Sequence, residues 1–116
     1  MEQIPILSTY PTADALAAII DLIKGYMDMR RANTIGADKY FHCLANCRGA
    51  RHGFAGDDTA EFFSEMREVA DLWKGDSIQA CNADRTANEV GRKGDKNHDC
   101  SQVCEAYRPL DLDSKY

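Results

Sequence analysis

The stretch FHCLANC, residues 41–47, carries two cysteines four positions apart, and HDCSQVC, residues 98–104, repeats this spacing near the other end of the chain. Residues four apart lie on one face of an α-helix. Two such segments packed side by side would bring four sulfur atoms together in a chain of only 116 residues. The two motifs therefore predict that the C-terminal region is fastened to a central helix, and this link decides the fold.

The pairing of the cysteines follows from the direction of the two segments. If they are antiparallel, Cys43 meets Cys104 and Cys47 meets Cys100. A disulfide requires Cα atoms about 6 Å apart, which a close helix–helix contact supplies. We favour two disulfides, but two alternatives stay open: buried free thiols in a reducing compartment and a zinc ion held by four thiolates. The fifth cysteine, Cys81, is expected to be a small buried residue, with a bridge between two chains as its alternative.

Length and composition place the chain among single-domain globular proteins. Its 116 residues and 44% hydrophobic content are ordinary for one folded domain. A net charge of −5 argues against non-specific binding to nucleic acid, which depends on clustered lysine and arginine. No uncharged run approaches the ~20 residues of a membrane span, and no segment resembles a secretory signal. The chain is therefore interpreted as cytosolic, or as a mature or excised part of a longer protein.

Helical periodicity and capping residues recur along the chain. Residues 1–11 contain two prolines and no clear period, so we expect an extended lead-in or linker there, followed by one helical domain over residues 12–116. Asp99 and Gln102 can cap one more short helical turn. No stretch alternates in the manner of a β-strand. The expected fold is an all-α four-helix bundle, with helices over residues 12–31, from 38 to the glycines near 50, over 58–75 and over 77–91.

Two of these helices carry stripes of large apolar residues. Because a small bundle needs an apolar core, we expect the stripe of the first helix to face that core instead of a membrane. The stripe of the third helix includes the single tryptophan. The first stripe consists of Leu16, Ile19, Ile20, Ile23 and Met27, and the other of Phe62, Met66, Val69 and Trp73 with Phe63 at its edge.

Five segments between Tyr26 and Tyr116 resemble one known family, in the same order along the chain. They are YMDMRRANTIGADKYFH, ARHG, AEFFSEMREVAD, ADRTANEVGRKGD and YRPLDLDSKY. Together they resemble the serum amyloid A family. The combination of DKYFH, A-D-x-x-A-N-E-x-G-R and the terminal Y-R-P-x-x-L-x-x-K-Y is distinctive. The resemblance implies a four-helix bundle with its C-terminal tail wrapped over it. It also implies a secreted, non-enzymatic protein that associates with lipid and carries small apolar ligands in oligomers.

The leading hypothesis is therefore binding without catalysis and without a cofactor or metal. The ligand is lipid, a small apolar molecule or a partner protein, and homo-oligomerisation would bury the apolar faces. Basic residues on two helices are candidates for contacts with anionic head groups, although a solvated surface is their alternative role. The candidate ligand-binding residues are Leu16, Ile19, Ile20, Ile23, Phe62, Phe63, Met66 and Trp73, and the candidate anion-binding residues are Arg30, Arg31, Arg48 and Arg51.

A second hypothesis belongs to a different class. The cysteine-bearing DKYFHC motif also resembles terminal domains of large bacterial secreted proteins of the polymorphic-toxin kind. The chain would then be a toxic module, membrane-disrupting or enzymatic, delivered from a larger secreted protein and neutralised by an immunity protein. Asp38 and His42 share a helix face and would supply the catalytic pair, whereas their structural alternative is a hydrogen bond inside the bundle. No H-E-x-x-H, G-x-S-x-G or Walker motif is present.

Overall fold

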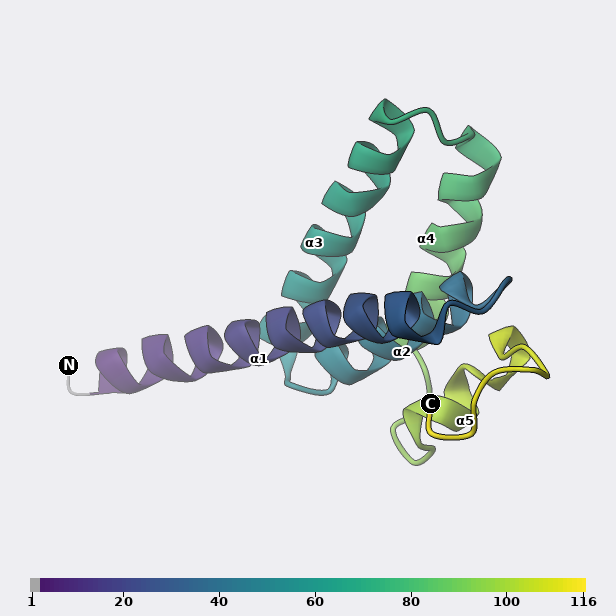
Figure 1. The fold of residues 1–116 in the computed structure, drawn as a ribbon. Coiled ribbons are helices and arrows are strands. Elements are labelled where there is room, and N and C mark those ends of the chain that lie inside the picture. Colours follow the sequence, from purple (N-terminus) through teal and green to yellow (C-terminus); the bar gives the residue numbers. More distant parts are fainter. Residues whose placement is uncertain (1–2) are drawn as a thin grey trace.

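The computed structural model describes residues 3–116, with side chains from residue 12 onward, and this part of the chain contains helices and no strand. None of these helices has a stretch that is both long and apolar enough to cross a membrane. The all-α prediction is therefore confirmed (Figure 1). The elements are α1 (Gln3–Ala32), α2 (Asp38–Ala50), α3 (Phe54–Trp73), α4 (Ile78–Arg92), the short α5 (Cys100–Val103) and the 3-10 helix η1 (Glu105–Tyr107).

Helix α2 lies at the centre of the bundle and contacts α1, α3, α4, α5 and η1. Every residue from Tyr40 to Cys47 is buried. A helix surrounded on all sides has to be apolar or small around its whole circumference, or carry polar groups that find partners inside. The FHCLANC segment meets this requirement, which explains why the most apolar part of this helix also carries the cysteines.

Close approach to α2 depends on glycines in the neighbouring helices. A Cβ atom on Gly25 of α1 would lie 2.8 Å from the Cβ of Ala45 in α2, closer than two carbon atoms can pack. A Cβ on Gly91 of α4 would overlap the backbone carbonyl oxygen of Cys43. Gly25 weakens α1 locally by about 1 kcal/mol relative to alanine, and in return it lets α1 lie directly against α2.

Two disulfides fasten the C-terminal region to α2, as the cysteine spacing predicts. Cys43 is bonded to Cys104 with 5.8 Å between Cα atoms, and Cys47 to Cys100 with 5.7 Å. Figure 1 shows α5 and the yellow C-terminal tail folded back alongside α2. Both the antiparallel pairing and the tail over the bundle are confirmed, and the free-thiol and four-thiolate zinc alternatives are excluded for these four residues.

The tail is also anchored by aromatic and polar contacts. The hydroxyl of Tyr40 accepts a hydrogen bond from Nη1 of Arg108 at 2.9 Å and donates one to the backbone carbonyl of Tyr116 at 3.3 Å. The rings of Phe41 and Tyr116 meet edge to face, with centroids 5.5 Å apart. These contacts seal the disulfide-bearing side of α2 from water, and Leu112 in the tail completes that core.

The helix boundaries agree with the sequence at most ends and differ at two. The starts of α2 at Asp38 and of α4 after the capping residue Ser77 are confirmed, as is the capping box of Asp99 and Gln102 on α5. Helix α1 begins at Gln3, so the expected start near residue 12 was wrong. Helix α3 begins at Phe54, directly after Gly53, and not at Asp58 as its D-x-x-E motif predicted. Residues 1–2 lie outside the described part, and a linker role for residues 1–11 stays a prediction.

The expectation that the apolar stripe of α1 faces the core was wrong. Leu16, Ile20 and Ile23 are each at least half exposed, and within residues 12–32 of α1 the buried positions are Ala18 and Gly25. The same inversion occurs in α3, whose buried residues are Gly56, Ala60, Ser64 and Glu68. The physical reason is the close packing on α2: apart from Glu68, the residues of α1 and α3 buried there are small, so many of the large apolar side chains remain exposed.

Candidate functional site

A cleft of about 450 Å³ lies between α1 and α3, with α2 as its floor. Its volume falls in the range of about 300–1,000 Å³ that is common for small-molecule sites. Its walls are mainly apolar, because the large side chains displaced from the α1–α2 and α2–α3 contacts gather along its rim. The lining residues are Ile19, Leu22, Ile23, Gly25, Tyr26, Met29, Phe41, His42, Ala45, Asn46, Phe63, Ser64, Arg67, Ala70, Asp71 and Lys74.

Basic side chains gather around Tyr26 at the edge of the cleft. The guanidinium carbon of Arg67 lies 4.5 Å from the centroid of the Tyr26 ring, and that of Arg30 lies 5.8 Å from it. Nη1 of Arg30 also donates to the Tyr26 hydroxyl at 3.2 Å, and this hydrogen bond lowers the pKa of the phenol. The apolar cleft therefore has a positively charged edge, to which Lys74 adds.

The eight residues proposed from sequence to bind a ligand fall into two groups. Ile19, Ile23 and Phe63 line the cleft. The other five do not line it and lie on the exposed faces of α1 and α3, where each is at least half exposed, so they form an apolar surface beside the cleft. These five are Leu16, Ile20, Phe62, Met66 and Trp73.

The four arginines proposed to bind anions do not form one patch. Arg30 lies beside Tyr26, and Arg31 pairs with Asp28 within α1 at 3.8 Å. Arg48 and Arg51 line a separate hollow with His52. There, Nη2 of Arg51 donates to the backbone carbonyls of residues 95 and 98. Anion binding by these residues stays a prediction.

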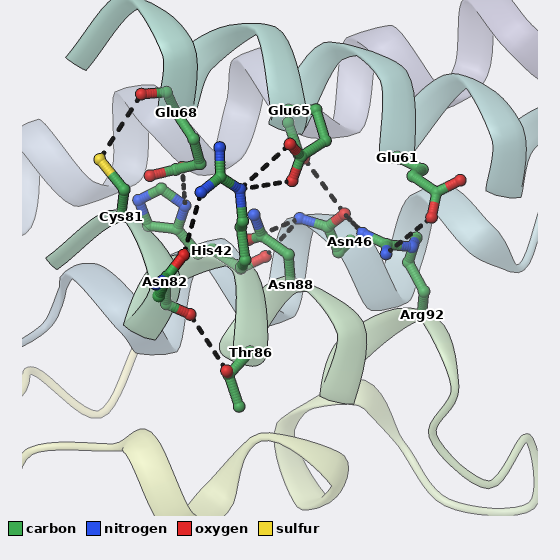
Figure 2. Close-up of polar contacts among 12 residues, drawn as sticks. His42, Asn46, Glu61, Glu65, Glu68, Cys81, Asn82, Thr86, Asn88 and Arg92 are labelled. Carbon is green, nitrogen blue, oxygen red and sulfur yellow. Dashed lines mark hydrogen bonds and ion pairs between the residues drawn. The ribbon is translucent and has the colours of Figure 1, made fainter. Parts of the chain in front are cut away.

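A polar network that the sequence analysis missed crosses the centre of the bundle (Figure 2). The amide nitrogen of Asn46 donates to Oδ1 of Asn88 at 3.0 Å and to the backbone carbonyl of His42 at 2.9 Å. Its amide oxygen accepts from Oγ of Ser64 and from Nη1 of Arg92, each at 3.1 Å. Both amide donors and both oxygen lone pairs are therefore used, and this one side chain fixes the register of α2, α3 and α4.

A second buried cluster joins the same three helices. A ring nitrogen of His42 in α2 and one carboxylate oxygen each of Glu68 in α3 and Asp84 in α4 all lie within 4.8 Å of one another. Nδ1 of His42 is 3.9 Å from Oε2 of Glu68, as Figure 2 shows for these two side chains. Burial, with the charge of Asp84, raises the pKa of Glu68 to about 8. Burial, with the charge of Arg67, lowers the pKa of His42.

The structure does not join Asp38 to His42 as expected. His42 is buried whereas Asp38 is exposed at the start of α2, and no hydrogen bond links their side chains within residues 12–116. The carboxylate close to His42 is Glu68, so the expected hydrogen bond to Asp38 was wrong. The spacing of residues in one helix cannot reveal this partner, because Glu68 comes from another helix. Cys81, by contrast, is a free buried thiol as predicted.

Comparison with known proteins identifies the family. The family model for serum amyloid A protein matches residues 10–116. Serum amyloid A-1 protein of Homo sapiens is 40% identical over 97 residues, covering 83% of this chain and 73% of that protein. Serum amyloid A protein of Anas platyrhynchos is 41% identical over 108 residues, covering 89% of this chain and 76% of that protein. Because the family model spans nearly the whole chain and these relatives match most of both lengths, the protein belongs to the serum amyloid A family.

Proposed function

We propose that this protein is a non-enzymatic carrier that binds an amphipathic apolar molecule, such as a fatty-acid-like lipid, in the cleft between α1 and α3. The cleft itself is the observation that carries the proposal. Its volume of about 450 Å³ suits a single small ligand, and large apolar side chains line it from both helices, Ile23 from α1 and Phe63 from α3. An apolar ligand would bury surface that is otherwise exposed to water, at about 25 cal/mol per Å².

The charged edge of the cleft supports an anionic head group on the ligand. At one edge the guanidinium of Arg67 lies over the Tyr26 ring and Arg30 donates a hydrogen bond to the Tyr26 hydroxyl. Lys74 also lines the cleft. One acidic residue, Asp71, shares the lining and pairs with Arg67 at 3.9 Å. Three cations against one carboxylate leave a net positive field beside an apolar wall, which is the environment a carboxylate or sulfonate on an apolar chain requires.

A fluorescence titration with 1-anilinonaphthalene-8-sulfonate tests the carrier function. This probe has an apolar ring system and one anionic group, and we expect saturable binding to one site. Ile23→Asp, which places a charge in the cleft, should weaken binding at least ten-fold. Ile35→Asp is the matched control, because Ile35 is 96% exposed and does not line the cleft. Equal affinity in both variants would refute the cleft as the binding site.

The exposed apolar surface beside the cleft supports contact with a lipid surface or with further copies of the chain. Leu16, Ile20 and Phe62 are each at least half exposed on the outer sides of α1 and α3. Sedimentation at increasing protein concentration tests self-association. Flotation with phosphatidylcholine vesicles tests lipid contact. Ile20→Asp should reduce whichever association occurs while leaving the probe affinity of the cleft unchanged.

Two disulfides support an extracellular or otherwise oxidising location, because such bonds rarely persist in the cytosol. We therefore propose secretion, which mass spectrometry of the unreduced protein from its native source would test. Recovery of four free thiols there would contradict it. The hypothesis of a toxic module with an immunity partner, delivered from a larger protein, stays a prediction. No observation on residues 12–116 favours it over the carrier.

A further inference from the structure

The buried cluster of His42, Glu68 and Asp84 contains a carboxylate without a partner. Both side-chain oxygens of Glu68 are inaccessible to water and neither has a hydrogen-bond partner. An unpaired charged group in a protein interior costs several kcal/mol, so it is normally neutralised by a proton or by a cation. The buried carboxylate of Glu68 therefore requires a bound proton or cation to neutralise its charge.

Nearby basic side chains do not supply that neutralising charge. Lys39 is directed to Asp84, with Nζ 3.6 Å from Oδ1. Arg67 precedes Glu68 in α3, but its guanidinium lies over the Tyr26 ring and pairs with Asp71. The imidazole of His42 is 3.9 Å from Glu68, beyond hydrogen-bonding distance. The side chain of Asp84 also approaches Glu68 and helps to raise the pKa of its carboxyl, so the three side chains converge on one small space.

The donor set matches a divalent transition-metal ion. It offers one imidazole nitrogen and two carboxylate oxygens, a combination that zinc accepts. A dication would neutralise the buried carboxylate of Glu68, which has no hydrogen-bond partner, whereas Asp84 is partly buried and also faces Lys39. Zinc bonds of about 2.0–2.1 Å place tetrahedral ligand atoms about 3.3 Å apart. The side chains, now up to 4.8 Å apart, would therefore have to close slightly around it.

We propose that His42, Glu68 and Asp84 form a binding site for a divalent transition-metal ion, with Zn²⁺ the best match, which would tie α2, α3 and α4 together. The ligands come from three different helices, so the ion would cross-link the bundle at a point that the disulfides do not reach. His42 also lines the cleft between α1 and α3, which gives the ion a route from solvent. The proposal is independent of whether an apolar ligand binds in that cleft.

Calorimetric titration with ZnCl₂ tests the site, using the oxidised full-length protein after treatment with a chelator and its removal. We expect one Zn²⁺ per chain. Glu68→Gln and Asp84→Asn should each weaken binding at least ten-fold. Glu68→Gln is the sharper variant, since it keeps the side-chain shape and removes a buried charge, and circular dichroism verifies its fold. Replacing zinc with Co²⁺ should give the visible absorption of a four-coordinate ion without a thiolate band.

Two matched variants separate this site from adventitious metal binding. His52→Gln removes another histidine that pairs with a carboxylate, since Nε2 of His52 is 2.7 Å from Oδ2 of Asp21. Cys81→Ala removes the free thiol, whose sulfur lies 3.6 Å from the backbone carbonyl of Glu68. Both variants should keep the wild-type affinity. No binding to the wild type, unchanged binding to Glu68→Gln, or loss of binding in either control would overturn the proposal.

Discussion

Cys47 and Cys100 are 53 positions apart in the sequence, yet their Cα atoms lie 5.7 Å apart across a disulfide. The bond between Cys43 and Cys104 lies one helical turn away on the same face of α2. The Cys47–Cys100 bond therefore lies inside the loop that the Cys43–Cys104 bond closes. When one bond is already present, the other closes only the short ring formed by residues 43–47 and 100–104. This relationship predicts how stability is divided between them.

Removing one bond should cost less than removing the second. In the chain-entropy model a loop of roughly 60 residues contributes about 4 kcal/mol, whereas a ring of roughly 10 residues contributes about 2–3 kcal/mol. Cys43→Ala with Cys104→Ala should therefore lower the free energy of unfolding by about 2–3 kcal/mol, measured by urea denaturation. Removal of all four cysteines should lower it by about 6–7 kcal/mol. Cys81→Ala is the control for the loss of a buried sulfur without a bond, and equal costs for the two steps would contradict the nested arrangement.

The raised pKa of Glu68 predicts a pH-dependent stability. In the unfolded chain Glu68 titrates near its ordinary value of 4.5, and in the folded protein near 8. Between these values the folded state retains a proton that the unfolded state has lost, so stability falls as the pH rises, by at most about 1.4 kcal/mol per pH unit. His42, Asp84, Asp71 and Arg67 contribute to the field at this carboxyl.

Glu68→Gln isolates this contribution, because glutamine does not titrate. With a chelator present, the difference in unfolding free energy between variant and wild type should widen in favour of the variant from about pH 4.5 to pH 8, then level off. Urea denaturation across this range measures it. Glu65→Gln, an exposed neighbour in α3, should show no comparable widening. A constant difference for Glu68→Gln would mean that the buried carboxyl titrates normally.

Gly91→Ala should destabilise the protein even though alanine favours helices. Helix propensity alone predicts a gain of about 1 kcal/mol. However, the new Cβ would overlap the carbonyl oxygen of Cys43, whose position the disulfide restrains. Overpacking of this kind costs about 1–3 kcal/mol, so we expect a net loss of up to about 2 kcal/mol in thermal denaturation. Gln79→Ala, on the exposed side of α4, should change stability by less than about 0.5 kcal/mol.

Tyr40→Phe tests the anchoring of the tail. The substitution keeps the buried ring but removes the hydroxyl that accepts from Arg108 and donates to Tyr116. Loss of these two hydrogen bonds should cost about 1–3 kcal/mol and increase amide exchange over residues 108–116. The disulfides would still hold α5, so exchange there should change little. Tyr107→Phe, in which the altered ring only packs against the core, serves as the control.

The difference between predicted and observed features follows from the range of the interactions involved. The predictions that rest on local sequence signals were confirmed: Asp38 begins α2, Ser77 caps α4, and Asp99 with Gln102 caps α5. These depend on backbone groups within a few residues. The start of α3 was misplaced because a D-x-x-E motif is also compatible with the interior of a helix, and Gly53 ends the preceding turn. The exposed apolar stripes were misassigned because periodicity reveals a face but not what that face contacts.

Of the candidate site, the sequence indicated Ile19, Ile23 and Phe63 as apolar contacts but not that they share one cleft. It also singled out His42, but with Asp38 as its partner. Asn46 carried a visible signal, as a polar residue in the otherwise small and apolar run around the cysteines. Glu68 carried none, because one glutamate in a charged helix resembles its solvated neighbours until the packing buries it.

The sequence by itself determined that the chain is helical and favoured one antiparallel cysteine pairing that attaches the tail, since repeat spacing, caps and two equal Cys-x-x-x-Cys intervals can be read from it. The structure decided between disulfides, free thiols and a zinc site for these cysteines. The tertiary structure alone decided which faces are buried. Glycine and alanine let the helices approach α2 so closely that large apolar side chains are left outside, while His42, Glu68 and Asp84 converge inside. That outcome depends on the distance between helix axes, which side chains from several helices set together.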